Sequence, residues 1–177
     1  MKIAKITALV GAFALAISTV NAGENLLKNS ELKIKEGTTR PQSWSGPKIA
    51  MSNETTDLPP GATNALKIEI KKAEKYNGYI GQKIKLTEPN MQFKVSVMVK
   101  SSVNRIAHIQ VKLFKNNKEL KRITENGSKL EWAEITKSFT TFDADELQVL
   151  CRFKQDEKSI GQTVWFTNVK LEKIPKQ

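Results

Sequence analysis

The fold of this chain is decided by two stretches of its sequence, FKVSVMV at residues 93–99 and LQVLCRF at residues 147–153. In both stretches every odd-numbered position carries an apolar side chain or the cysteine, and most even-numbered positions carry a polar one. A period of two with one apolar side is typical of a half-buried β-strand. We therefore expect two strands that bury their odd-numbered side chains and turn their even-numbered ones toward water.

The same alternation recurs in shorter segments along most of the chain. These segments are residues 66–71, 83–86, 108–113 and 164–169. Turn-forming pairs such as Asn77-Gly78 and Asn116-Asn117 separate them, and residues 115–118 are predicted to turn a hairpin. Strands with one apolar side are buried economically when two antiparallel sheets pack together. The sequence therefore predicts an all-β fold, a two-sheet antiparallel β-sandwich or jelly roll.

The start of the chain has the pattern of a secretory signal peptide, residues 1–22. Lys2 and Lys5 supply its positive charge, an uncharged apolar run follows, and small residues precede the expected cleavage after Ala22. An uncleaved N-terminal anchor is the alternative. No other stretch is apolar enough for membrane insertion. We expect residues 23–177 to form one domain, secreted or periplasmic.

Charge and cysteine content narrow the function classes. The chain carries 29 Lys and Arg against 18 Asp and Glu, a formal net charge of +11. Such a surplus attracts polyanions, although a basic, well-solvated surface is the alternative. Scattered cations and few aromatic residues argue against nucleic acid as a partner. Cys151 is the only cysteine, so no internal disulfide forms, and its place in an apolar row indicates a buried structural thiol.

Several segments occur in the order of a known family's motifs. The chain has NLLKNSEL at residues 25–32, then Pro41 and Trp44, and it closes with VWFTNVKL at residues 164–171. The segments between them are residues 65–70, residues 84–100, and Leu130-Glu131-Trp132 followed by Phe139. Together they resemble the jelly-roll carbohydrate-binding modules that accompany xylanases and glucanases, which belong to the galactose-binding-like sandwiches. The resemblance implies a β-sandwich that binds sugars without catalysis.

The resemblance also implies a structural calcium site that joins the two chain ends. Its ligands include acidic side chains, but Lys33 occupies the position of the family's Glu and Thr167 that of its Asp. Calcium needs oxygen ligands, and a lysine beside it would repel it. We therefore predict that the site is absent or degraded, although Glu31 and Asn168 remain nearby, and we expect no cofactor.

In modules of this kind a sheet face often holds an extended glycan. The side chains predicted on that face are Ser96, Met98, His108, Gln110, Lys112, Gln148, Leu150 and Arg152. Glutamine amides and an arginine fork can bridge adjacent hydroxyl groups or grip a carboxylate. Arg152 with Lys112 would therefore suit a uronic acid or a sulfated sugar. The alternative is that these are ordinary solvent-facing strand residues.

Sugar rings also stack on aromatic side chains. Tyr76 and Tyr79 flank the turn at Asn77-Gly78 and are the predicted stacking residues, at the loop rim. Trp44, in an irregular segment, is interpreted either as packing or as a ligand contact. The family uses the positions of Trp132 and Trp165 for packing, so core roles are expected there.

No catalytic pattern accompanies these candidates. His108 is the only histidine, and the two acidic clusters, at residues 143–146 and 156–157, fall in loops without the apolar setting that raises a carboxyl pKa. The leading prediction is an exported, non-enzymatic protein that binds an oligo- or polysaccharide, with an acidic sugar as one candidate. The alternative is an exported structural or interaction β-sandwich that contacts envelope or matrix proteins without binding sugar.

Overall fold

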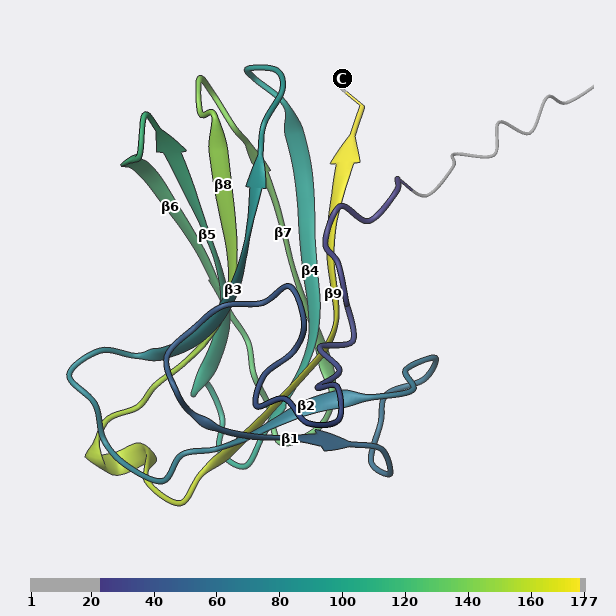
Figure 1. Ribbon diagram of the computed structural model, residues 1–177, viewed down its shortest axis with the longest axis vertical. Coiled ribbons are helices and arrows are strands. Elements are labelled where there is room, and N and C mark those ends of the chain that lie inside the picture. Colours follow the sequence, from purple (N-terminus) through teal and green to yellow (C-terminus); the bar gives the residue numbers. More distant parts are fainter. Residues whose placement is uncertain (1–22, 176–177) are drawn as a thin grey trace, which may run out of the picture.

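Both alternating stretches form β-strands, and they lie in different sheets of the computed structural model (Figure 1). Residues 93–99 lie within β4 (Gln92–Ser101) and residues 147–153 within β8 (Glu146–Phe153). The structure describes residues 23–175, so the predicted signal peptide, residues 1–22, lies outside the described residues.

Within residues 23–175, nine strands make up two sheets, and every paired strand is antiparallel to its neighbour. The five-stranded sheet has the order β1 (Ala50–Glu54), β2 (Ala65–Glu69), β9 (Thr163–Ile174), β4 and β7 (Ala133–Thr140). The four-stranded sheet has the order β3 (Gly78–Lys85), β8, β5 (Ala107–Lys115) and β6 (Lys118–Asn126). Figure 1 shows β6, β5, β8 and β3 on one side of the molecule and β4 and β9 on the other. The predicted two-sheet antiparallel sandwich is confirmed.

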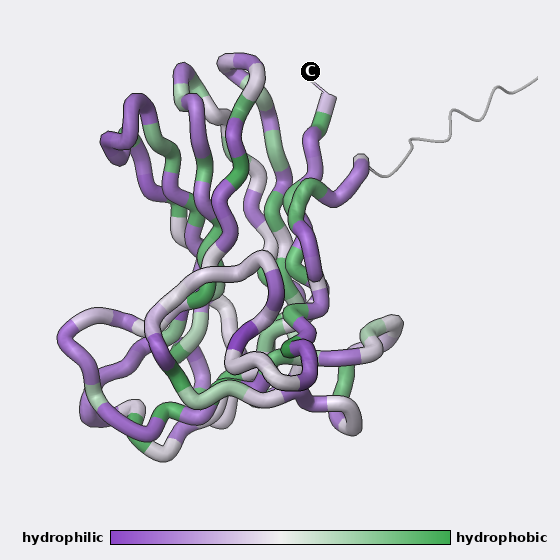
Figure 2. The backbone as a smooth tube through the Cα atoms, viewed as in Figure 1, coloured by the Kyte–Doolittle hydropathy of each residue, from purple (hydrophilic) through white to green (hydrophobic). Residues whose placement is uncertain are grey.

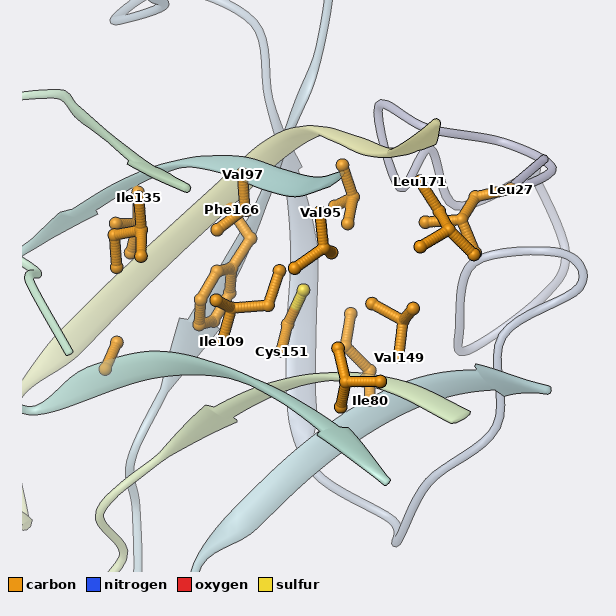
Figure 3. Close-up of a cluster of buried hydrophobic side chains, with 14 of the residues drawn as sticks. Leu27, Ile80, Val95, Val97, Ile109, Ile135, Val149, Cys151, Phe166 and Leu171 are labelled. Carbon is orange, nitrogen blue, oxygen red and sulfur yellow. The ribbon is translucent and has the colours of Figure 1, made fainter. Parts of the chain in front are cut away.

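The core lies between the sheets and is built from the odd-numbered side chains of the two stretches. All eight are fully or almost fully buried. In Figure 3, Val95 and Val97 of one sheet point toward Val149 and Cys151 of the other. Hydrophilic and hydrophobic residues alternate along the strands in Figure 2, as the period of two requires. Burial raises the pKa of the Cys151 thiol, which confirms its structural role.

The even-numbered side chains follow the prediction only in part. Ser96 and Leu150 point away from the sandwich interior and are nevertheless buried. Ser96 and Met98 were expected on the binding face, and this was wrong. Both belong to β4, which pairs with β7 and β9 in the sheet opposite that face. Alternation predicts which side of a strand is polar, but not which strands become its neighbours.

The hairpin turn between β5 and β6 lies at the turn-forming residues that the sequence predicted. Asn116 and Asn117 turn the β5–β6 hairpin with φ values of 49° and 64°, in the left-handed region that asparagine tolerates. The irregular segment that contains Trp44 is followed by strand β1, which pairs with β2 at the sheet edge. Within residues 23–175, no helix is long and apolar enough to span a bilayer.

Candidate functional site

The outward face of the four-stranded sheet gathers most of the predicted ligand-binding residues. Strand register places its side chains in rows that run from β3 through β8 and β5 to β6. The rows are Tyr79–Arg152–His108–Asn126, then Gly81–Leu150–Gln110–Thr124, then Lys83–Gln148–Lys112–Arg122. Because alternate residues of a strand share a face, the polar positions of β5 and β8 meet there as predicted.

A pocket of about 420 Å³ lies on this face, and we call it the sheet-face pocket. Its lining residues are Tyr76, Asn77, Tyr79, Lys112, Arg122, Gln148, Leu150 and Arg152. The lining thus combines two tyrosine rings, two amides, one aliphatic side chain and three cations. Five of the predicted ligand-binding residues are among them, and no carboxylate is.

The floor of the sheet-face pocket depends on a glycine. Gly81 lies directly opposite Leu150, and a Cβ atom at Gly81 would come within 2.6 Å of Leu150 Cδ2. Because glycine has no Cβ, the Leu150 side chain packs over β3 at this position, and Leu150 is only 3% exposed. The pocket therefore has an apolar floor on an otherwise polar face.

Arg152 is held in place by two neighbours. Its Nη1 donates to Gln110 Oε1 at 2.9 Å, and its Nη2 donates to the Asn77 carbonyl oxygen at 3.3 Å. Gln110 in turn donates to Thr124 Oγ1 at 3.0 Å. Gln110 is buried and does not line the pocket, so its observed role is to support Arg152.

One carboxylate neutralises two of the pocket cations. Glu119 accepts hydrogen bonds from Arg122 Nε and Nη2 at 2.8 and 3.0 Å, and Lys112 Nζ lies 3.0 Å from its Oε2. The Arg122 hydrogen bonds are the main reason that the pKa of Glu119 is lowered to about 2. Arg122 is a lining residue that the sequence analysis missed. The predicted hairpin was the available signal, because it places β6 beside β5.

His108 lies next to Arg152 and is half-buried, but it does not line the pocket. Burial, followed by the charges of Arg152 and Lys154, lowers the pKa of His108 to about 4. The imidazole is therefore neutral near neutral pH. A neutral ring beside a guanidinium leaves the positive charge of this part of the face to Arg152.

Two of the three tryptophans do not occupy the predicted places. Trp44 is only 4% exposed, and its Nε1 donates to the Lys28 carbonyl oxygen at 3.0 Å, which favours the packing interpretation. Trp132 and Trp165 were expected in the core but are only half-buried. Trp165 points outward because its neighbours along β9, Val164 and Phe166, point into the core.

The two outward tryptophans belong to a different surface, on the five-stranded sheet. The Lys100 Nζ lies 5.6 Å from the centroid of the Trp165 ring, and the same lysine forms an ion pair with Asp57. Trp132 Nε1 donates to the Asp57 carbonyl oxygen at 3.2 Å. These contacts hold the loop after β1 against the sheet.

A second hollow, of about 560 Å³, adjoins the first at the end of β3, and we call it the rim pocket. Its lining residues are Pro47, Lys48, Ile49, Lys72, Glu74, Lys75, Tyr76, Asn77, Gly78, Tyr79 and Gln155. Tyr76, Asn77 and Tyr79 line both pockets. Tyr76 is 72% exposed, so its ring is open to solvent where the two pockets meet.

Thr167, at one of the positions that the resemblance assigns to calcium, and the nearby Glu31 are engaged in hydrogen bonds. Both carboxylate oxygens of Glu31 accept from Thr63, at 2.8 and 2.6 Å, and Thr167 Oγ1 donates to the Asn64 carbonyl oxygen at 2.6 Å. Within residues 23–175, Asn64 Oδ1 is buried without a partner. One neutral oxygen falls far short of the about six to eight oxygens that calcium takes. The residues present therefore do not fit the family's calcium ion.

Solved structures match this fold, although no family model matches the chain and no curated protein matches its sequence. The CBM22-1 xylan-binding domain of Paenibacillus barcinonensis Xyn10C aligns with a TM-score of 0.61 and 14% identity, over 88% of this chain and 98% of that one. TmCBM61, solved in complex with β-1,4-galactotriose, aligns with a TM-score of 0.57 and 14% identity, over 85% and 99%.

A further match is the enzymatically active domain of tailspike protein 4 from bacteriophage CBA120. It has a TM-score of 0.61 and 11% identity over 81% of this chain, which spans only 22% of that protein. At such identities a structural match shows the fold alone. The sequence resemblance is confirmed at that level: the chain has the jelly-roll sandwich fold found in several carbohydrate-binding modules.

Proposed function

We propose that this protein is an exported, non-catalytic carbohydrate-binding protein that holds an oligo- or polysaccharide on the outward face of the four-stranded sheet. One observation carries the proposal: the sheet-face pocket joins an apolar floor and tyrosine rings to amide and guanidinium donors. A sugar ring presents apolar C–H faces and a rim of hydroxyl groups, so it needs both kinds of surface.

The individual side chains suit these contacts. Leu150 and Tyr79 offer apolar surface to a ring face, and the Gln148 amide can both donate to and accept from hydroxyl groups. Arg152 is already oriented by Gln110 and Asn77, so its binding loses little side-chain entropy. The carbohydrates named for two structural neighbours, xylan and galactotriose, support this ligand class.

The site chemistry supports binding without catalysis. Hydrolysis of a glycosidic bond commonly requires two carboxyl groups that flank it, whereas no carboxylate lines the sheet-face pocket. Burial, followed by the charges of Arg152 and Lys154, lowers the pKa of the one histidine to about 4, which makes it a weak general base at neutral pH. Release of reducing sugar from any polysaccharide by the purified protein would contradict this part of the proposal.

Glycan-array binding followed by titration calorimetry tests the proposed site. Gln148→Ala should weaken the best-bound oligosaccharide about 10-fold, the equivalent of one or two lost hydrogen bonds. The matched control is Gln92→Ala, which truncates a half-buried glutamine on the opposite sheet. Equal weakening by both variants would remove the site from this face, and failure to bind any glycan would defeat the proposed function.

The export part of the proposal has its own test. The secreted or periplasmic form should begin at Gly23, because the small residues before it fit signal-peptide cleavage. Intact-mass measurement of protein from the culture medium or periplasm gives the mature N-terminus. Retention of residues 1–22 in the exported form would favour an uncleaved anchor instead.

The competing function is contact with an envelope or matrix protein without sugar binding. It is favoured by two exposed apolar side chains, Leu120 and Phe142, which are 48% and 45% exposed. Lys121, which follows Leu120 in β6, lies over the Phe142 ring. A protein partner captured by the intact chain but lost in Phe142→Ser, with no glycan bound, would support this function.

A further inference from the structure

Positive charge dominates both pockets. The sheet-face pocket is lined by Lys112, Arg122 and Arg152 with no carboxylate in the lining. The rim pocket is lined by three lysines and one glutamate. Since the two pockets share Tyr76 and its neighbours, they form one continuous basic track from the sheet face to the loop rim.

Ion pairs neutralise only part of this charge. Glu119 forms ion pairs with both Lys112 and Arg122, and Lys72 forms an ion pair with Glu74. Among the residues that the structure describes, Arg152, Lys48 and Lys75 have no ion-pair partner. The uncompensated cations therefore lie at two places, one in each pocket.

Among these three cations, Arg152 has the least favourable surroundings for a positive charge. It is half-buried, and the Nε atom of its guanidinium has no hydrogen-bond partner within residues 23–175. Burial, followed by the charge of Arg122, lowers the pKa of Arg152, which means that its surroundings disfavour the charged form. An arginine keeps its proton regardless, so an anion beside it relieves this electrostatic penalty.

We propose that the carbohydrate bound by this track is anionic, with one acidic group at Arg152 and another at Lys48 and Lys75. The proposal rests on the proposed function and names its ligand class: a sugar chain bearing carboxylate or sulfate groups. Arginine suits such groups because its planar fork matches their oxygen atoms. Lysines at the exposed rim act as point charges that tolerate several positions of the second group.

The surface between the two charged places also fits a sugar chain. Tyr76 is exposed, and Lys75 Nζ lies 5.5 Å from the centroid of its ring. A sugar ring stacked on Tyr76 would bring its acidic substituent close to Lys75. On the other side, the Asn77 carbonyl oxygen holds Arg152 at the edge of the same loop. One ligand chain can therefore follow the loop from one cation to the other.

Titration calorimetry with defined oligosaccharides tests the proposal. The probes are an oligogalacturonate, the same oligomer after reduction of its carboxyl groups, and a heparin-derived sulfated oligosaccharide. At least one acidic oligomer should bind about 10- to 100-fold more tightly than the reduced one, and raising the salt concentration should weaken it. Comparison of the two acidic probes shows whether carboxylate or sulfate is preferred.

Three variants of equal charge change locate the effect. Arg152→Gln and Lys75→Gln should each weaken the acidic oligomer about 10-fold or more and leave the reduced oligomer nearly unchanged. Lys170→Gln, an exposed lysine on the five-stranded sheet, is the control and should keep the binding intact. Lys75 is a loop residue that can be replaced without disturbing a strand, so it keeps the test valid if Arg152→Gln does not fold.

The outcomes distinguish a preference for anionic sugars from carbohydrate binding itself. Equal binding of acidic and reduced oligomers would overturn the anionic ligand and leave carbohydrate binding in place. Equal losses in Arg152→Gln, Lys75→Gln and Lys170→Gln would show a general charge effect and overturn the assigned track. If neither acidic, reduced nor other neutral glycans bind, the proposed function fails together with this inference.

Discussion

At the scale of single residues, His108 is a histidine kept neutral by its neighbours. It faces Arg152 across the β5–β8 pair, and Lys154 adds a further positive charge. These charges and its partial burial oppose protonation. The residue therefore links the stability of the protein to pH in a direction that the structure predicts.

His108 should destabilise the protein as the solution becomes acidic. In the unfolded chain its pKa is near the ordinary 6.5, whereas in the folded protein it is about 4. Between these values the unfolded state takes up a proton that the folded state does not, so stability falls as pH drops from 6.5 toward 4. Above about pH 7 the residue contributes no pH dependence.

Urea unfolding across this pH range gives the measurement, with His108→Gln as the comparison. The variant lacks the titrating group, so its free energy of unfolding should fall less steeply than that of the natural protein between pH 6.5 and 4. Carboxylates that titrate in the same range affect both proteins alike. Parallel curves for the two proteins would contradict the lowered pKa.

At the scale of elements, hydrogen bonds join strand β9 to the opening segment, where the sequence resemblance implied a calcium site. Thr167 Oγ1, which is buried in β9, donates to the Asn64 carbonyl oxygen, and the Asn64 Nδ2 donates to the Glu31 carbonyl oxygen at 3.0 Å. These contacts connect segments that lie far apart in the sequence. They therefore connect the two segments directly.

Two measurements test this direct connection. Neither calcium nor a chelator should shift the melting temperature, because the donor set does not fit the ion. Thr167→Val should lower the free energy of unfolding by about 1–3 kcal/mol, since it leaves a buried carbonyl oxygen without its partner. A rise in melting temperature on adding calcium, abolished by Glu31→Gln, would show that a cation site persists.

At the scale of the whole molecule, the two sheets share a single core and should unfold together. Val97 comes from the five-stranded sheet and Val149 from the four-stranded one, and both are buried in the same cluster (Figure 3). A substitution in either sheet removes contacts from that common core. Independent unfolding of one sheet would leave the apolar face of the other in water.

Val97→Ala and Val149→Ala should therefore each lower the global free energy of unfolding, by about 2 kcal/mol. Tryptophan fluorescence and far-ultraviolet circular dichroism should report a single coincident transition in both variants. Trp165 lies in β9 and Trp132 directly before β7, so two of the three tryptophans report on the five-stranded sheet, whereas dichroism reports on both sheets. The two signals would therefore diverge if the four-stranded sheet unfolded separately. Divergent transitions would contradict the shared core.

On the outward face of the four-stranded sheet, the sequence alone predicted some of the side chains that line the sheet-face pocket. Alternation in β5 and β8 placed Lys112, Gln148 and Arg152 on one side, and the structure keeps all three in the sheet-face pocket. Gln110 and Arg152 were both expected to face a ligand, yet Gln110 became the buried support of Arg152. That difference depends on how deep each side chain lies, which alternation does not specify.

Other features of the site arise from contacts across strands. Leu150 is an apolar exception in the polar row of β8. The structure explains it, because Gly81 lies opposite Leu150 and leaves room for its side chain. Arg122 reaches the pocket because a register shift after Leu113 sets the β5–β6 pairing. A glycine and a bulge act through their partners, so their effects appear only when the pairing is known.

The sequence by itself determined the strands and the side chains that they bury, because a period of two is a local property of extended backbone. Only the tertiary structure decided which outward side chains meet, because the order of strands in a sheet depends on long-range pairing. That order moved Ser96 and Met98 to the opposite sheet and brought Tyr79 from β3 beside Arg152. The basic track across the two pockets is a product of this pairing.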